Sequence, residues 1–201
     1  MGKSEKIILA SASPRRAELL RSEGIDFEVR VNPHKEPHRK PAGIPAELWP
    51  MCLAFIKAQA VRATCQPPAL PGGRTVILGA DTIVVEGERI LNKARDRSHA
   101  RQILASLSGK EHRVITGICL MSADGKRERL ANATARCRLQ LTSRQLEAYL
   151  DTGLWKGKAG AYGIQDDHDP FVTLLEGDIT TVIGLPLELV KRELAAFRRG
   201  T

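Results

Sequence analysis

The sequence predicts an α/β fold with a mixed sheet, and two observations support this. Short apolar strands alternate with amphipathic helical stretches along the 201 residues, as is typical of α/β domains. Two long strand-like runs, 112–121 and 131–141, follow one another across Asp124-Gly125 and predict a hairpin that makes the sheet mixed rather than wholly parallel. No linker separates independent domains. We therefore expect one domain over residues 1–201, with two lobes around a cleft.

The first half of the chain is expected to hold three main strands and two helices. An apolar run ends at two serines, and Ser13-Pro14 then begins a helix that Gly24 stops. A long helix follows a polar loop at 32–43, and its predicted buried stripe comprises Trp49, Cys52, Leu53, Ile56, Ala60 and Ala63. The strands are expected at Ile7–Ala10, Phe27–Val31 and Thr75–Val85, the last interrupted at 79–82, and the helices at Pro14–Glu23 and Ala46–Ala63.

The second half alternates in the same way. A turn at 86–88 leads to a short strand around Ile90, and the continuous apolar run at 112–121 predicts a buried central strand. Residues 131–141 alternate apolar and polar, which predicts a half-exposed strand. The remaining expected elements are helices at Asp96–Leu107, from Thr142 to Leu150 and at Pro186–Phe197, a glycine-rich loop at Gly153–Gln165, and a hairpin of Phe171–Leu175 with Thr180–Ile183.

The charge, the aromatic content and the cysteine spacing of the chain favour some classes of protein function and disfavour others. A formal net charge of +8 favours anionic partners, whereas 4% aromatic residues and scattered charges disfavour a stacking surface for nucleic acid. The four cysteines show no metal-binding or disulfide spacing, so we expect reduced thiols in a cytoplasmic protein. No run is long enough for a signal peptide or a membrane span, and the five histidines show no metal-ligand spacing.

The segment Leu9–Leu20 predicts a phosphate-binding site. Two serines, a proline and two arginines lie where a strand meets a helix N-terminus, and arginine binds phosphate in a bidentate fork. The alternative is an ordinary helix start, with Ser13 as N-cap and the arginines solvated. Both interpretations stay open on this segment alone.

Other candidate residues carry charge in apolar or glycine-rich surroundings. Asp81 lies within an apolar run, where a carboxylate is costly unless it is paired, hydrogen-bonded or metal-bound. Lys57 is the only charge between Glu47 and Arg62 on the long helix, and a snorkelling surface lysine is the alternative. The glycines of 155–165 leave room for a ligand's close approach, while Lys158 offers charge and Gln165 an amide that can read a base edge.

Taken together, the ordered motifs resemble the Maf family of nucleotide pyrophosphatases over almost the whole chain. The motifs are Leu-Ala-Ser-Ala-Ser-Pro-Arg-Arg from Leu9, Leu-Ala-x-x-Lys-Ala at 53–58, Gly-Ala-Asp-Thr at 79–82, Leu-Ser-Gly-x-x-His at 107–112, Thr116-Gly117, 158–165 and 184–187. The resemblance implies a strongly twisted mixed sheet of the inosine-triphosphate-pyrophosphatase type. It also implies hydrolysis of a nucleoside triphosphate to the monophosphate and pyrophosphate with a divalent cation, Mg²⁺ or Mn²⁺.

The resemblance also implies residue roles. Asp81 matches the proton acceptor, Ser11, Lys57 and Lys93 match phosphate-binding or catalytic positions, and Arg15, Thr82 and Gln165 match substrate-selecting positions. Glu36 matches an acidic position that is a candidate metal ligand beside Asp81. The Gly-Ala-Asp-Thr and Ala-Gly-Ala-Tyr-Gly-Ile-Gln motifs resemble the branch acting on dTTP and UTP, with CTP or modified nucleotides as further substrates.

Two alternatives and two departures accompany this resemblance. The alternatives are the same chemistry on 7-methyl-GTP and a basic nucleic-acid- or protein-binding module without enzyme activity, and a homodimer is a further expectation. The departures are Asn92-Lys93-Ala94, where the family has proline after the lysine, and the acidic residues at 166, 167 and 169, where glycine usually follows the glutamine.

Overall fold

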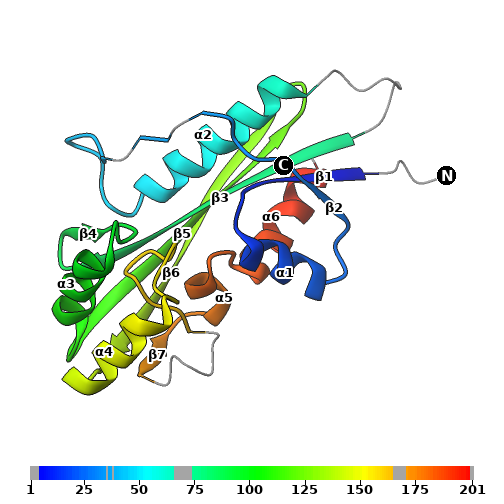
Figure 1. Cartoon of the computed structure of the whole chain (residues 1–201). Helices are drawn as coiled ribbons and strands as arrows, with labels where there is room; N and C mark the ends of the chain where they lie inside the picture. The colour runs from blue at the N-terminus through cyan, green and yellow to red at the C-terminus, as the bar shows by residue number, and fades with distance from the viewer. Residues whose placement is uncertain (1–4, 35, 38, 66–73, 165–170, 200–201) are drawn as a thin grey trace. The chain divides into compact units, whose positions relative to one another are not determined.

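A computed structural model describes residues 5–34, 36–37, 39–65, 74–164 and 171–199 of the chain (Figure 1). Strands and helices alternate within these residues, as predicted. Their order is β1 (Glu5–Ala10), α1 (Pro14–Ser22), β2 (Phe27–Val29), α2 (Trp49–Thr64), β3 (Arg74–Glu86), β4 (Arg89–Leu91), α3 (Arg97–Leu107), β5 (Lys110–Ser122), β6 (Glu128–Leu139), α4 (Ser143–Thr152), β7 (Val172–Glu176), α5 (Ile179–Ile183) and α6 (Leu187–Arg199).

The strands of the described residues form a seven-stranded sheet in the order β2-β1-β3-β5-β6-β7, with β4 added to β3. β1 pairs in parallel with both β2 and β3, whereas β4 pairs antiparallel with β3, and β7 antiparallel with β6. Crossover helices are needed between parallel strands, and α1 and α2 serve as these connections. The mixed sheet predicted from the sequence is therefore confirmed.

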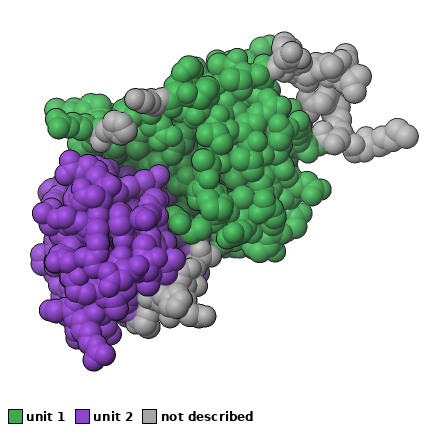
Figure 2. Space-filling view, in the orientation of Figure 1, with its two compact units in different colours: residues 1–81, 116–132, 184–201 green, residues 82–115, 133–183 purple. Residues whose placement is uncertain are grey.

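The chain divides into two compact units, coloured separately in Figure 2. Unit 1 comprises residues 1–81, 116–132 and 184–201, and unit 2 comprises residues 82–115 and 133–183. Three strands, β3, β5 and β6, contribute residues to both units. The single domain with a cleft between two lobes stays a prediction.

In unit 1, helix α2 packs directly onto the sheet. Its buried residues Ala54, Ala58 and Val61 join Ile8 and Ile77 of the strands in one apolar cluster, and Figure 1 shows α1 and α6 on the opposite side of the sheet from α2. Two glycines allow the close approach. A Cβ added to Gly79 would lie 2.1 Å from the Ala54 carbonyl oxygen, and one added to Gly117 would lie 2.4 Å from the backbone of Pro50 and Met51. Main chain thus packs against main chain.

Unit 2 has its own apolar core beneath helices α3 and α4. Ile103, Leu104 and Leu107 of α3 pack with Leu150 of α4 and with the strands. Arg97 and Arg101 of α3 pair with Glu147 of α4 at 3.0 and 2.6 Å. The alternation predicted for β6 is present, because residues 135, 137 and 139 are buried and 134, 136 and 138 are exposed.

Three predictions about elements are wrong. β3 runs without the interruption expected at 79–82, because glycine there makes room for α2 rather than for a turn. Residues 179–183 form α5 instead of a strand, since the Asp178 carboxylate accepts the Thr180 N–H at 2.6 Å and begins a helix despite the β-branched residues that follow. The buried stripe of α2 runs through Trp49, Pro50, Leu53, Ala54, Lys57, Ala58 and Val61. Of the residues predicted for it, Cys52, Ile56 and Ala60 are only half-buried and Ala63 is exposed.

The central strand agrees with its prediction. Residues 114–121 of β5 are buried without a break, as expected for a central strand. All four cysteines are free thiols, with Cys119 and Cys137 buried. Among the described residues, no helix combines the length and the apolar character that crossing a bilayer requires.

We predict that Gly79→Ala costs about 3 kcal/mol or more of unfolding free energy, because its methyl group must push α2 off the sheet. The control is Gly43→Ala, where φ is +83° but nothing lies within 4 Å of the added Cβ. Backbone strain alone makes that change cost about 1 kcal/mol. Urea unfolding of both variants measures the difference, and equal losses would contradict the packing argument.

Candidate active site

Asp81 lies in the middle of β3 with its side chain 15% exposed. An ionised carboxylate at such a position needs a partner of opposite charge. The partner is Lys57 of α2, whose Nζ lies 2.5 Å from Asp81 Oδ1. The interpretation of Asp81 as a carboxylate held by a specific partner is therefore supported by the geometry.

Lys57 directs its ammonium group at three oxygen atoms rather than at solvent. Besides Asp81 Oδ1, its Nζ lies 3.2 Å from Glu36 Oε2 and 3.3 Å from the Ala80 carbonyl oxygen. Only 11% of its side chain is exposed. The alternative of a snorkelling lysine is thus wrong, because Lys57 belongs to the buried stripe of α2.

The carboxylates of Glu36 and Asp81 are brought together by this shared ammonium. No group of three or more His, Cys, Asp or Glu side chains suited to a metal occurs among the described residues. Two carboxylates and a carbonyl nevertheless form an all-oxygen donor set, and Mg²⁺ is commonly bound through one or two carboxylates together with substrate phosphates. The residues present are therefore compatible with a hard divalent cation.

Arg16 organises the turn between β1 and α1. Its Nε donates to the Gly184 carbonyl at 2.7 Å, and its Nη1 donates to Ser11 Oγ at 3.0 Å and to the Ala80 carbonyl at 2.9 Å. Burial lowers the pKa of this guanidinium, and the Asp81 carboxylate opposes that shift. Arg16 therefore ties three distant segments of unit 1 together.

The neighbouring residues of this turn differ in exposure. Ser11 is buried, and its hydroxyl accepts both Arg16 and the Ser13 backbone N–H at 3.2 Å. Ser13 occupies the N-cap position without a capping side-chain hydrogen bond, and Pro14 follows at the start of the helix. Arg15 is half-buried. The two arginines thus play different parts, with Arg15 the more accessible.

Unit 2 contains the other described candidates. Thr82 follows Asp81 on β3, and Lys93 pairs with Ala159 in an isolated antiparallel bridge that brings the segments of Lys93 and Lys158 side by side. Lys158 is buried and Lys93 is exposed. Gln165 and the acidic residues at 166, 167 and 169 lie outside the described residues.

The glycine-rich loop packs closely against β3 at Gly160. A Cβ added there would lie 2.9 Å from Val84 Cγ2, and the next residue, Ala161, adopts a φ of +60° that is unusual for a non-glycine residue. The room left by Gly160 is therefore filled by Val84, whereas nothing lies within 4 Å of a Cβ added to Gly157. The prediction that this loop binds a ligand stays a prediction.

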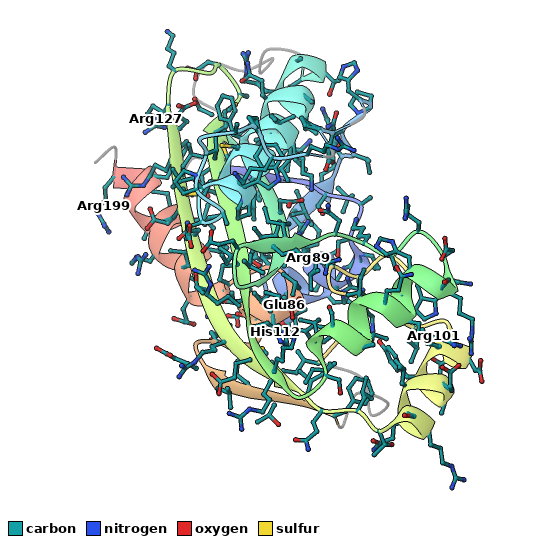
Figure 3. All side chains as sticks on the ribbon, turned by 90° about the vertical axis from the view of Figure 1, so that its left-hand side faces the viewer. Glu86, Arg89, Arg101, His112, Arg127 and Arg199 are labelled. Atoms are coloured by element: carbon teal, nitrogen blue, oxygen red, sulfur yellow. The ribbon has the colours of Figure 1, made fainter. Side chains whose placement is uncertain are left out.

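His112 fixes the same loop through Tyr162. Its Nε2 lies 2.6 Å from the Tyr162 hydroxyl, and the two rings meet edge to face. Figure 3 shows His112 near the start of β5, beside Glu86 of the neighbouring strand. Burial lowers the pKa of His112 to about 4, so the ring is neutral near pH 7.

The sequence did not indicate that Arg16 anchors the turn after β1 or that His112 holds the glycine-rich loop through Tyr162. The pairing of two arginines could have indicated that one faces inward, because adjacent residues of a helix point about 100° apart. For His112, the signal was its place at the beginning of an apolar strand, where a polar ring needs a partner. That partner lies fifty residues away and has no local pattern.

We predict that Arg16→Met lowers the unfolding free energy by about 3 kcal/mol, because the Gly184 carbonyl loses its buried charged donor. Arg15→Met is the matched control on the adjacent residue and costs less than about 1 kcal/mol. Urea unfolding of both variants makes the comparison. Equal losses would show that Arg16 does not organise the turn.

We predict that His112 makes the protein less stable as pH falls from 6.5 to about 4. In that window the unfolded chain takes up a proton that the buried ring does not, which removes up to roughly 3 kcal/mol of stability. His112→Gln flattens the dependence, whereas His99→Gln, on α3, retains it. Urea unfolding at several pH values tests this, and parallel curves for His112→Gln and the wild type would refute it.

Comparison with known proteins identifies the family. A family model described as "Maf-like protein" matches residues 6–197. A dTTP/UTP pyrophosphatase of Desulfitobacterium hafniense is 42% identical over 100% of this chain and 89% of its own length, and one of Bacillus cytotoxicus is 40% identical over 98% and 97%. Among solved structures, a nucleoside-triphosphatase (dITP/XTP pyrophosphatase) of Mycobacterium abscessus matches with a TM-score of 0.43 and 17% identity, covering 96% of this chain and 97% of the other. The match over nearly all of its length shows that this chain belongs to the Maf family.

Proposed function

We propose that this chain hydrolyses a nucleoside triphosphate to the monophosphate and pyrophosphate, with dTTP and UTP as preferred substrates. The names of relatives about 40% identical over nearly the full length support this activity. The structural observation that carries it is the carboxylate of Asp81, held 2.5 Å from Lys57 beside Glu36. A carboxylate in such a setting can serve as a general base.

Asp81 accepts a proton from the attacking water in this proposal. The water oxygen forms a bond to the α-phosphorus, the bond from that phosphorus to the bridging oxygen breaks, and pyrophosphate leaves with the electron pair. The Lys57 ammonium neutralises charge on the phosphate oxygens. Such chemistry depends mainly on positioning and on stabilisation of developing charge.

Glu36 and Asp81 are the proposed ligands of a divalent cation, Mg²⁺ or Mn²⁺. When bound, this cation supplies positive charge that offsets the charge of the triphosphate. Both carboxylates are accessible enough to bind a cation, because 35% of the Glu36 side chain and 15% of the Asp81 side chain are exposed.

Most of the remaining roles follow the family resemblance: Ser11 and Lys93 are proposed to bind phosphates, and Arg15, Thr82 and Gln165 to select the substrate. Lys158 is proposed to bind the substrate through its charge, because it lies in the glycine-rich loop. The bridge between Lys93 and Ala159 supports a joint role for the two lysines, because it holds their segments together. A homodimer and a cytoplasmic location stay predictions. A basic binding module without activity gains no support from relatives that are named as enzymes.

We predict that pyrophosphate release is fastest with dTTP and UTP in a panel that includes CTP and 7-methyl-GTP, assayed with Mg²⁺ or Mn²⁺. Asp81→Asn should lower kcat by about a thousandfold or more while the circular dichroism spectrum stays that of the wild type. Lys191→Met, on the exposed face of α6, is the active control. Preference for 7-methyl-GTP would reassign the substrate, and near-normal turnover by Asp81→Asn would remove its role as base.

A further inference from the structure

The ammonium of Lys57 occupies a position that resembles a cation site. Three oxygen atoms converge on its Nζ: Asp81 Oδ1 at 2.5 Å, Glu36 Oε2 at 3.2 Å and the Ala80 carbonyl at 3.3 Å. An ammonium group has three N–H donors, so this set can use all of them. Carboxylate and carbonyl oxygens are also the ligands that hard divalent cations prefer.

Lys57 and a divalent cation therefore compete for the same oxygens. Two cations about 3 Å apart repel each other strongly even at the effective dielectric constant of a protein surface, by roughly 10 kcal/mol for charges of one and two. We propose that Lys57 is the resident cation of the free protein and that it must leave Glu36 and Asp81 before a divalent cation can bind them. This inference rests on the proposed function, which supplies the triphosphate as the new partner of Lys57.

Lys57 is suited to this exchange, whereas Arg16 is not. The Arg16 guanidinium is held by the carbonyls of Gly184 and Ala80 and by Ser11, on three separate segments. Lys57 has a flexible four-carbon stem and a compact charge that can turn to another anion. Arg16 thus stays as a fixed charge while Lys57 moves to the phosphates, so metal and nucleotide bind together more readily than the metal binds alone.

The test is a titration with Mn²⁺ in the absence of nucleotide, with the free ion followed by electron paramagnetic resonance. We expect Lys57→Met to bind Mn²⁺ at least about tenfold more tightly than the wild type, because two carboxylates lose their competing cation. Adding Asp81→Asn to Lys57→Met should abolish the gain. A smaller gain, or none, in Lys57→Met overturns the proposal.

Lys191→Met is the matched control. Lys191 also lies between two carboxylates, Glu23 at 2.5 Å and Glu188 at 3.0 Å, but its side chain is 42% exposed. Its removal should leave Mn²⁺ affinity unchanged, and an equal gain in this variant would show that any freed carboxylate pair suffices. Lys57→Gln, which keeps N–H donors without charge, replaces methionine if that variant folds poorly and carries the same expectation. Because no nucleotide is present, the result is independent of pyrophosphate release.

Discussion

The carbonyl oxygen of Ala80 is the point on which the candidate site depends, because two buried cations donate to it. Arg16 donates to it from the first turn of α1, and Lys57 donates to it from α2. Cations are stable at this depth only if carboxylates and carbonyls surround them. Asp81, the next residue, supplies the opposing charge. The strand, the turn and the helix are thus joined by one network of charged hydrogen bonds, and each member is positioned by the others.

The family motifs combine residues of two kinds. Asp81 and Lys57 present charge to one another, whereas Gly79 and Gly117 let the backbone of α2 contact the sheet. Gly160 has a similar packing role against Val84 in unit 2. Gly79 and Gly117 therefore let α2 come close enough to the sheet for Lys57 to reach Asp81.

Much of the architecture could be predicted from the sequence because hydrophobic periodicity is a local signal. The alternation of β6 and the unbroken apolar run of β5 each indicated their elements correctly. The buried stripe of α2 was predicted correctly at Trp49 and Leu53 and wrongly further along, because Lys57 interrupts the apolar pattern although the lysine itself is buried. The β-branched residues of 179–183 favour a strand by propensity, but these residues form a helix whose N-terminus is capped by Asp178. Partners far apart in sequence, such as Arg16 with Gly184 and His112 with Tyr162, leave no local pattern at all.

The close contact between Gly79 and Ala54 limits where residues can be inserted into or deleted from this chain. Lys57 lies one helical turn after Ala54, so the main-chain contact fixes the direction in which the lysine points. Deleting or adding a single residue between those two positions would rotate Lys57 by about 100° around the helix axis and away from Asp81. The same change before Trp49, where the chain is not yet helical, leaves that rotation unaltered. Homologous chains should therefore differ in length before α2 and not within it.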